Sequence, residues 1–185
     1  MQTFLISLAT VALAEIGDKT QLLALILAAK YRRPWTICAG ILAATLLNHA
    51  LAGAFGAWIA AWLSPSTLRV LVAVGFFAVA AWTLVPDRAS EDEAARGAGH
   101  GVLFATIVSF FLAEVGDKTQ IATAVIAAEY RPLWMVVAGT TCGMLLADAP
   151  AVWLGARFAE RLPLKAARLG AALLFAGLAV WILLK

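Results

Sequence analysis

A nine-residue string occurs twice in this chain, and both copies lie inside apolar segments. Residues 13–21 read LAEIGDKTQ and residues 112–120 read LAEVGDKTQ, so the two copies differ at one position and are 99 residues apart. Each copy carries three charged side chains, and a charge at the centre of a bilayer costs roughly 2.5–3.5 kcal/mol on insertion scales. Acids in such a setting need partners, and a cation is the simplest partner for several of them.

The remainder of the chain has the composition of a membrane protein. Of its 185 residues, 63% are hydrophobic and 14% are charged, and the mean hydropathy is +0.91. Because apolar runs of about 20 residues cross a bilayer, we predict an all-α membrane protein with six transmembrane helices. The predicted spans are 3–29, 35–63, 68–85, 102–128, 133–157 and 164–184. The basic residues lie at span ends, so the net charge of +3 does not indicate nucleic acid as a partner.

The 99-residue offset extends beyond the string and indicates an internal duplication. Identical residues at this offset include Tyr31 and Tyr130, Arg32 and Arg131, Trp35 and Trp134, and Gly40 and Gly139. We predict a first three-helix repeat at 1–86, a linker at 87–101 and a second three-helix repeat at 102–185. Three spans per repeat is an odd number, so the second repeat enters the membrane from the opposite side. This is the 3+3 inverted-topology repeat of many secondary transporters, whose substrate sites lie near the midplane.

The distribution of Lys and Arg predicts the orientation in a cell inner membrane. Nine of them fall on one side and three on the other, while Lys19 and Lys118 lie within the spans. We therefore expect both termini outside, in the periplasm, and the central linker in the cytoplasm. The nine are Lys30, Arg32, Arg33, Arg88, Arg96, Arg157, Arg161, Lys165 and Arg168, and the three are Arg69, Arg131 and Lys185.

The spacing of the acids within the two strings predicts a cation site. Glu15 and Asp18 lie three residues apart and so share one helix face, and Glu114 and Asp117 repeat that spacing. If the two helices meet at the midplane, four carboxylates converge. The site offers oxygen ligands, which suit Ca²⁺, Mg²⁺ and Mn²⁺ better than Zn²⁺ or Cu⁺.

Other residues of the two strings support this prediction. Gly17 and Gly116 lie between the acids, where glycine lets the backbone open and frees carbonyl groups. Hydroxyl and amide oxygens follow within one turn, with the amides as predicted ligands and the hydroxyls in support. These residues are Thr20, Gln21, Thr119 and Gln120.

Polar residues also occupy the middle of the second and fifth spans. Asn48 and His49 lie in the second span, and the position 99 residues after His49 is Asp148. We predict Asn48 and Asp148 as further metal ligands and His49 as a supporting or gating residue. Pro150 follows in the fifth span and removes a helical hydrogen bond to the carbonyl of Leu146.

The two lysines allow an alternative interpretation of the strings. Glu15 and Lys19 are four residues apart in the favourable order, as are Glu114 and Lys118, so each string could neutralise itself. That pairing would leave both aspartates without partners. We expect the lysines instead to orient the carboxylates or to replace the cation.

These motifs resemble those of a known family. Two Glu-x-Gly-Asp-Lys/Arg-Thr motifs in six spans are similar to the manganese and calcium cation-exchanger family. That family includes Golgi and chloroplast-envelope members and bacterial manganese exporters, within the LysE-type transporter superfamily. The resemblance covers the whole chain and implies export of Mn²⁺, with Ca²⁺ as a second substrate, in exchange for protons. It carries over to Glu15, Gly17, Asp18, Lys19, Thr20, Glu114, Gly116, Asp117, Lys118 and Thr119.

The charge balance also favours an antiporter. Five carboxylates and two ammonium groups in the spans leave a formal charge of −3, which is too costly to move across a bilayer unneutralised. Protons would therefore compete with a divalent cation for the carboxylates. The metal is then a substrate, and no resident cofactor is expected.

Three other classes remain as alternatives. An amino-acid or small-solute exporter of the same superfamily could use Lys19 or Lys118 to bind a substrate carboxylate, but acids outnumber bases in the spans five to two. A membrane-embedded metal hydrolase would need a His-Glu-x-x-His motif, which the sequence lacks, so we do not expect an enzyme. A structural subunit would not need five carboxylates within the membrane.

Overall fold

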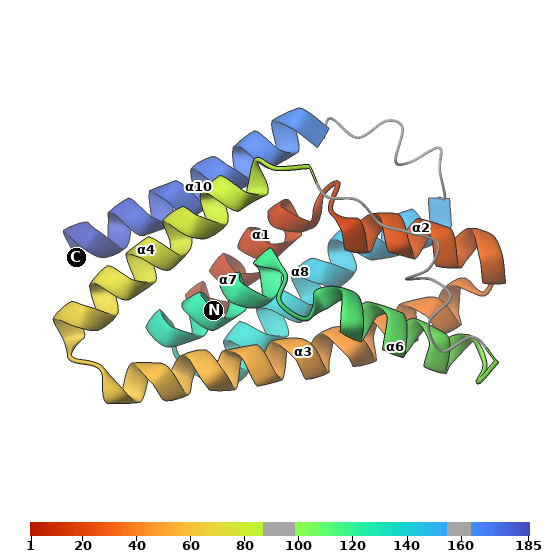
Figure 1. Ribbon diagram of the computed structural model, residues 1–185, viewed down its shortest axis with the longest axis horizontal. Helices are drawn as coiled ribbons and strands as arrows, with labels where there is room; N and C mark the ends of the chain where they lie inside the picture. Colours follow the sequence, from red (N-terminus) through yellow and green to blue (C-terminus); the bar gives the residue numbers. More distant parts are fainter. Residues whose placement is uncertain (87–98, 155–163) are drawn as a thin grey trace.

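The computed structural model describes residues 1–86, 99–154 and 164–185, and these residues form helices with no strand (Figure 1). The all-helical prediction is therefore confirmed for the described part of the chain. Most of the predicted linker and the end of the predicted fifth span lie outside the described residues, as do four of the basic residues used to predict orientation, Arg88, Arg96, Arg157 and Arg161. The helices are α1 (Gln2–Glu15), α2 (Lys19–Tyr31), α3 (Pro34–Trp62), α4 (Pro65–Thr83), α6 (Val102–Glu114), α7 (Lys118–Glu129), α8 (Leu133–Leu154) and α10 (Leu164–Leu184).

The first and fourth predicted spans are each interrupted at their glycine. α1 ends at Glu15 and α2 begins at Lys19, and α6 and α7 are separated in the same way. Gly17 and Gly116 both have φ of 78°, in the left-handed region that a residue with a Cβ adopts at a cost. The chain opens at these glycines, as predicted, but the expectation that the two acids of each motif share one helix face is wrong, because the break separates them.

Local signals explain where the long helices begin. α2 ends at Tyr31, the capping residue Arg32 turns the chain with a φ of 53°, and α3 starts with Pro34 in its first turn. α4 likewise has Pro65 in its first turn, and the Ser64 side chain accepts a hydrogen bond from the Thr67 amide. Proline suits the first turn because the amide it lacks would have no partner within the helix.

Four described helices are long and apolar enough to cross a membrane, namely α3, α4, α8 and α10. α1 and α6 are apolar but shorter, since the interruptions divide the first and fourth predicted spans. The exterior carries many exposed large apolar side chains, including Leu47, Leu51 and Phe55 of α3. A surface of this kind is expected where lipid surrounds the protein. The six-span arrangement itself stays a prediction.

Equivalent helices of the two repeats make equivalent contacts. α1 packs along α8, and α6 packs against α3. A Cβ added at Gly139 of α8 would lie 2.5 Å from the Phe4 carbonyl oxygen of α1, and one added at Gly40 of α3 would lie 2.6 Å from Cβ of Thr106 in α6. Gly40 and Gly139 are 99 residues apart, so the same glycine permits the same close approach in both halves.

The third helix of each repeat breaks this equivalence. α4 and α10 pack against each other, with the rings of Phe76 and Phe175 centred 6.2 Å apart. α10 then contacts α1, whereas α4 contacts α7 (Figure 1). If the equivalence held throughout, α4 would contact α6. Among the described residues, the third helices therefore make their main contacts with each other and with α1 and α7.

Candidate cation site

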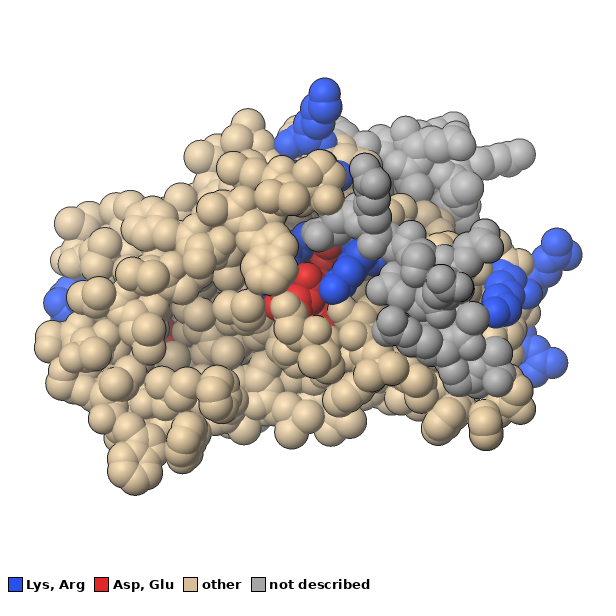
Figure 2. Space-filling view, viewed as in Figure 1, with Lys and Arg blue, Asp and Glu red and all other residues tan. Residues whose placement is uncertain are grey.

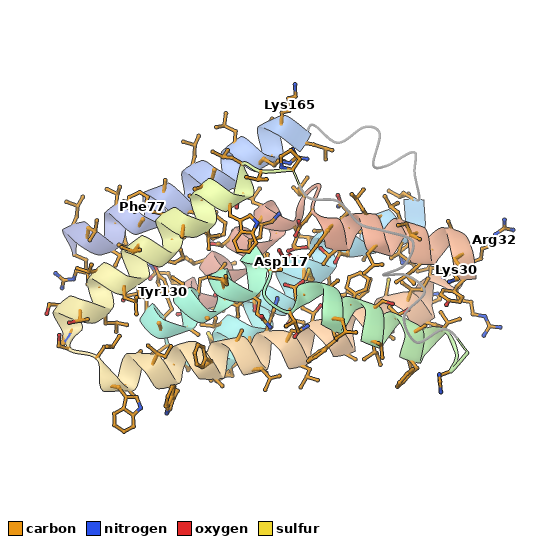
Figure 3. The ribbon with its side chains drawn as sticks, in the orientation of Figure 1. Lys30, Arg32, Phe77, Asp117, Tyr130 and Lys165 are labelled. Atoms are coloured by element: carbon orange, nitrogen blue, oxygen red, sulfur yellow. The ribbon has the colours of Figure 1, made fainter. Side chains whose placement is uncertain are left out.

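Four carboxylates from the two interruptions lie inside the protein. Glu15 ends α1, and Asp18 directly precedes α2. Glu114 and Asp117 occupy the same places between α6 and α7. All four residues are at most 2% exposed. Figure 3 labels Asp117 at the centre of the molecule, and Figure 2 shows acidic atoms at the centre of this face beside basic ones.

Each motif glutamate is held by the threonine five residues later. The Thr20 hydroxyl donates a hydrogen bond to Oε2 of Glu15, and the Thr119 hydroxyl donates to Oε1 of Glu114. The predicted supporting role of the threonines therefore has a direct contact in each repeat. Glu15 also lies close enough to Glu114 and Asp117 for like-charge repulsion. Each threonine thus orients a carboxylate that is repelled by the neighbouring carboxylates.

The two glutamines bridge the interruptions. Oε1 of Gln21 accepts from the Gly17 amide at 2.9 Å, and Oε1 of Gln120 accepts from the Gly116 amide at 2.7 Å. Nε2 of Gln21 donates to the Ala147 carbonyl oxygen in α8 at 2.9 Å. Each glutamine side chain therefore replaces a helical hydrogen bond at the break, and Gln21 also links the break to the other repeat. Each such hydrogen bond contributes about 0.5–1.5 kcal/mol to stability.

Asn48 takes the place equivalent to Ala147. Nε2 of Gln120 lies 3.4 Å from Oδ1 of Asn48 in α3. Nδ2 of Asn48 donates to the Phe111 carbonyl oxygen in α6 at 3.1 Å. Asn48 and Ala147 are 99 residues apart, so both glutamines reach the same position of the opposite repeat. Asn48 is buried between α3 and α6 with both ends of its amide in contact with protein.

The ion pairs of the site cross from one motif to the other. Nζ of Lys118 lies 2.6 Å from Oδ1 of Asp18, and Nζ of Lys19 lies 3.6 Å from Oδ1 of Asp117. The alternative interpretation, in which each motif pairs its own glutamate with its own lysine, is not what the described residues show. The lysines instead bind the aspartates that this interpretation left over.

His49 and Asp148 lie against this group, as their mid-span positions predicted. Both are 0% exposed, and Nε2 of His49 is 3.8 Å from Oε1 of Glu114. Asp148 is close enough to Glu15 and Glu114 for like-charge repulsion. Within the described residues, neither ring nitrogen of His49 and neither carboxylate oxygen of Asp148 has a hydrogen-bond partner. Such atoms are rare in protein interiors and call for an explanation.

Several motif oxygens share this property. In the described part of the chain, one oxygen each of Glu15, Glu114 and Asp117 is buried without a hydrogen-bond partner. No three His, Cys, Asp or Glu side chains among the described residues converge closely enough to hold a metal ion in this conformation. The predicted site residues thus share one buried region, but their ligand atoms are not arranged around a common point.

Two features of this region were not predicted. The first is the crosswise direction of the ion pairs, because one lysine per motif balances charge without specifying which copy supplies its partner. The second is the environment of the two glycines. A Cβ added at Gly17 would lie 2.6 Å from Cδ2 of Leu164 at the start of α10, whereas one added at Gly116 would meet none of the described residues within 4 Å.

Comparisons with known proteins place this geometry in context. The chain matches the family described as divalent cation/proton antiporter GDT1 over residues 3–91 and 102–185. It is 49% identical over 165 residues to the "Putative manganese exporter" of Vibrio cholerae serotype O1, covering 89% of this chain and 82% of that protein. It is 28% identical over 193 residues to a GDT1-like protein of Synechocystis, covering 95% and 93% of the two chains. No solved structure matches the chain.

Proposed function

This chain belongs to the GDT1 family of divalent cation/proton antiporters, and on that basis we propose that it exports Mn²⁺ through the cell inner membrane in exchange for protons. The observation that carries the proposal is the group of buried carboxylates contributed by both repeats. Several of their oxygens have no hydrogen-bond partner in the described residues. A divalent cation supplies what these oxygens lack. The similarity to the protein from Vibrio cholerae supports Mn²⁺ as the substrate.

We assign the ligand role to the carboxylates. Four of the five carboxylates lie at helix ends and one lies within α8, and all are buried. They are Glu15, Asp18, Glu114, Asp117 and, within α8, Asp148. Carboxylate oxygens suit hard divalent cations, which bind six or more oxygens. Because these side chains do not surround a common point, binding requires a local movement that brings them together around the ion.

The lysines then act as alternatives to the metal. Lys118 and Lys19 each neutralise an aspartate of the opposite motif. A divalent cation entering the site would displace these ammonium groups from Asp18 and Asp117. The two lysines would thereby limit the charge that the protein must carry when the metal leaves.

The neutral residues hold the site in place. Gln21 and Gln120 use their amide oxygens to accept hydrogen bonds from Gly17 and Gly116, and Asn48 uses its amide to join two helices. We therefore propose that all three residues position the interruptions, although their type and spacing also predicted them as ligands.

We further propose that the helices form six spans as two inverted three-helix repeats, 1–86 and 102–185, joined by the linker 87–101. The interrupted pairs α1–α2 and α6–α7 supply the first and fourth spans. The shared close approach at Gly40 and Gly139 and the Phe76–Phe175 contact between equivalent residues support this arrangement. Inverted repeats of this kind exchange contacts between two states, which provides alternating access.

Exchange with protons follows from the charge of the region. Five carboxylates and two lysines give the site a formal charge of −3, and a bound divalent cation brings this charge to −1. If the protein returned to its inward-facing state without metal, the site would carry the charge of −3 in a medium of low dielectric constant, which is unfavourable. Protons taken up from outside would neutralise the carboxylates for the return step. An inward proton gradient would then drive the metal outward.

Flux measurements test this proposal directly. Purified protein in proteoliposomes should move Mn²⁺ in response to an imposed pH gradient, with protons moving the opposite way. The same protein should lower cellular manganese and restore growth on Mn²⁺ in a strain that lacks its own exporter. Glu129→Gln, nine residues after the second motif and at the opposite end of α7 from Lys118, serves as a variant that should keep this activity. Unchanged manganese content with correctly inserted protein would overturn the substrate, and flux indifferent to pH would overturn the coupling.

We also propose that both termini face the periplasm. Lys30 and Arg32 lie at one end of the molecule in Figure 3, consistent with a basic cytoplasmic end. Single cysteines at residues 2 and 185 should react with an impermeant thiol reagent applied outside the cell, whereas one at residue 95 should not. The reverse labelling pattern would overturn the orientation and leave the repeat intact.

A further inference from the structure

The two halves of the site differ in ligand chemistry at one buried position. The motif acids are the same in both copies, but the equivalent mid-span residues are His49 in α3 and Asp148 in α8. One half therefore presents a nitrogen where the other presents carboxylate oxygens. Both residues are fully buried, so the difference lies inside the site and not on the surface.

The surroundings of His49 point toward a ligand. Its Nε2 lies 3.8 Å from Oε1 of Glu114, and the ring is close enough to Glu15 to interact with it electrostatically. His49 thus lies beside acids of both repeats. Neither of its ring nitrogens has a hydrogen-bond partner among the described residues. A histidine retained only for packing would normally have one nitrogen hydrogen-bonded, because an unpaired buried polar atom is destabilising.

We propose that His49 supplies a nitrogen ligand to the transported ion and so determines specificity, favouring Mn²⁺ over Ca²⁺ and Mg²⁺. Imidazole binds first-row transition metals, whereas Ca²⁺ and Mg²⁺ take oxygen ligands. Carboxylates alone would accept all three ions. Replacing one oxygen group by an imidazole costs Mn²⁺ little and deprives the alkaline-earth ions of a ligand. This inference rests on the proposed function, since it concerns the ion that the same site would export.

Competition measurements test the specificity. Mn²⁺ flux into proteoliposomes would be followed at increasing Ca²⁺ for the wild type, His49→Asp and His100→Ala. His49→Asp makes the two mid-span positions alike, and we expect it to lower the preference for Mn²⁺ over Ca²⁺ by on the order of tenfold. His100 is exposed and is the only other histidine of the chain, so His100→Ala should leave the preference unchanged. If His49→Asp fails to insert, His49→Asn, which is neutral and close in size, replaces it.

Pulsed electron paramagnetic resonance tests the ligand itself. Mn²⁺ bound to the wild type and to His100→Ala should show the nitrogen coupling of a coordinated imidazole, and His49→Asp should lack it. A histidine that only fills space would not produce this signal. Wild-type protein that transports Mn²⁺ without nitrogen coupling, or an unchanged ion preference in His49→Asp, would overturn the inference and leave the proposed function standing. Nitrogen coupling without any Mn²⁺ flux would support the ligand and overturn export.

Discussion

The two interruptions have nearly the same sequence but different surroundings. Gly17 is buried beneath Leu164, whereas Gly116 is exposed, and no described residue lies within 4 Å of the point where its side chain would begin. The ion pairs also differ, and the shorter and more buried pair is the one whose aspartate, Asp18, lies at the first interruption. The Lys118 side chain is 4% exposed and lies 2.6 Å from its aspartate, while the Lys19 side chain is 21% exposed and lies 3.6 Å from its own.

The third helices account for this difference. α10 begins at Leu164, beside the first interruption, and the residue equivalent to Leu164 in the first repeat is Pro65, at the start of α4. Within the ranges that the structure describes, nothing comparable covers Gly116. Identical motifs can therefore occupy one covered and one open environment, because the packing of a neighbouring helix and not the motif decides exposure. A transporter with inverted repeats needs such a difference if its site opens to one side at a time.

Neutralising the motif acids should have the largest effect on transport. Glu15→Gln, Asp18→Asn, Glu114→Gln and Asp117→Asn should each reduce Mn²⁺ flux at least about 100-fold, because each removes a charged ligand from one shared site. Insertion should survive, since amides are less costly to bury than carboxylates. Flux in proteoliposomes and the amount of inserted protein are the measurements.

These four variants also test whether the covered and open motifs are equally necessary. Glu129→Gln, which removes a carboxylate near the surface, is the matched control and should transport normally. If two of the four motif variants kept wild-type flux, the two motifs would not form a single site. Loss confined to one motif would show that the sequence repeat is not a functional repeat.

Removing the lysines should affect stability unequally. Lys118→Met should destabilise the protein by about 3 kcal/mol, because it removes the buried ammonium group that lies 2.6 Å from Oδ1 of Asp18. Lys19→Met should cost about 0–1 kcal/mol, because its pair is longer and partly exposed to solvent. Thermal unfolding of purified protein in detergent measures both.

An exposed pair provides the control for this comparison. Lys185 lies 3.2 Å from Glu129, and its side chain is 63% exposed, so Lys185→Met should leave the unfolding temperature nearly unchanged. Equal losses for Lys118→Met and Lys19→Met would contradict the asymmetry between the two interruptions.

Alanine at the two glycines should give the smallest difference. Both substitutions place a Cβ on a residue with φ of 78°, which costs roughly 1–2 kcal/mol. Gly17→Ala should cost about 1 kcal/mol more than Gly116→Ala, because its Cβ also meets the end of the Leu164 side chain. In the double variant Gly17→Ala/Leu164→Ala this excess should disappear. In Gly116→Ala/Leu164→Ala the changes in the free energy of unfolding should simply add. Equal unfolding temperatures for the two single variants would show that Leu164 moves aside without cost.

Much of the fold followed from composition and periodicity. Long apolar runs predicted the membrane helices, and the glycine between two acids predicted a local opening of the backbone in the first and fourth spans, where the structure has glycines with positive φ. The offset between the two copies predicted which residues occupy equivalent positions, such as Gly40 and Gly139. These features depend on local chemistry and on identity between repeats, both of which are visible in the amino-acid order.

Other features could not be predicted from one chain. Charge balance required each lysine to have a partner, but whether Lys118 binds Glu114 or Asp18 depends on which helices meet. Gln21 and Gln120 had the composition of ligands, and only the structure showed that their oxygens accept hydrogen bonds from the glycine amides. Their assignment as metal ligands, like that of the carboxylates, stays a prediction.

The sequence by itself determined that this protein is built of membrane helices, that acids and lysines occur in two equivalent strings, and that a glycine lies between the acids of each string. Only the tertiary structure decided that the ion pairs cross between the copies and that Leu164 covers one interruption and not the other. The physical reason is that burial and pairing are properties of neighbours in space. Two nearly identical strings have the same local preferences, but α4 and α10 pack on the same side of the molecule, so the two strings acquire different neighbours.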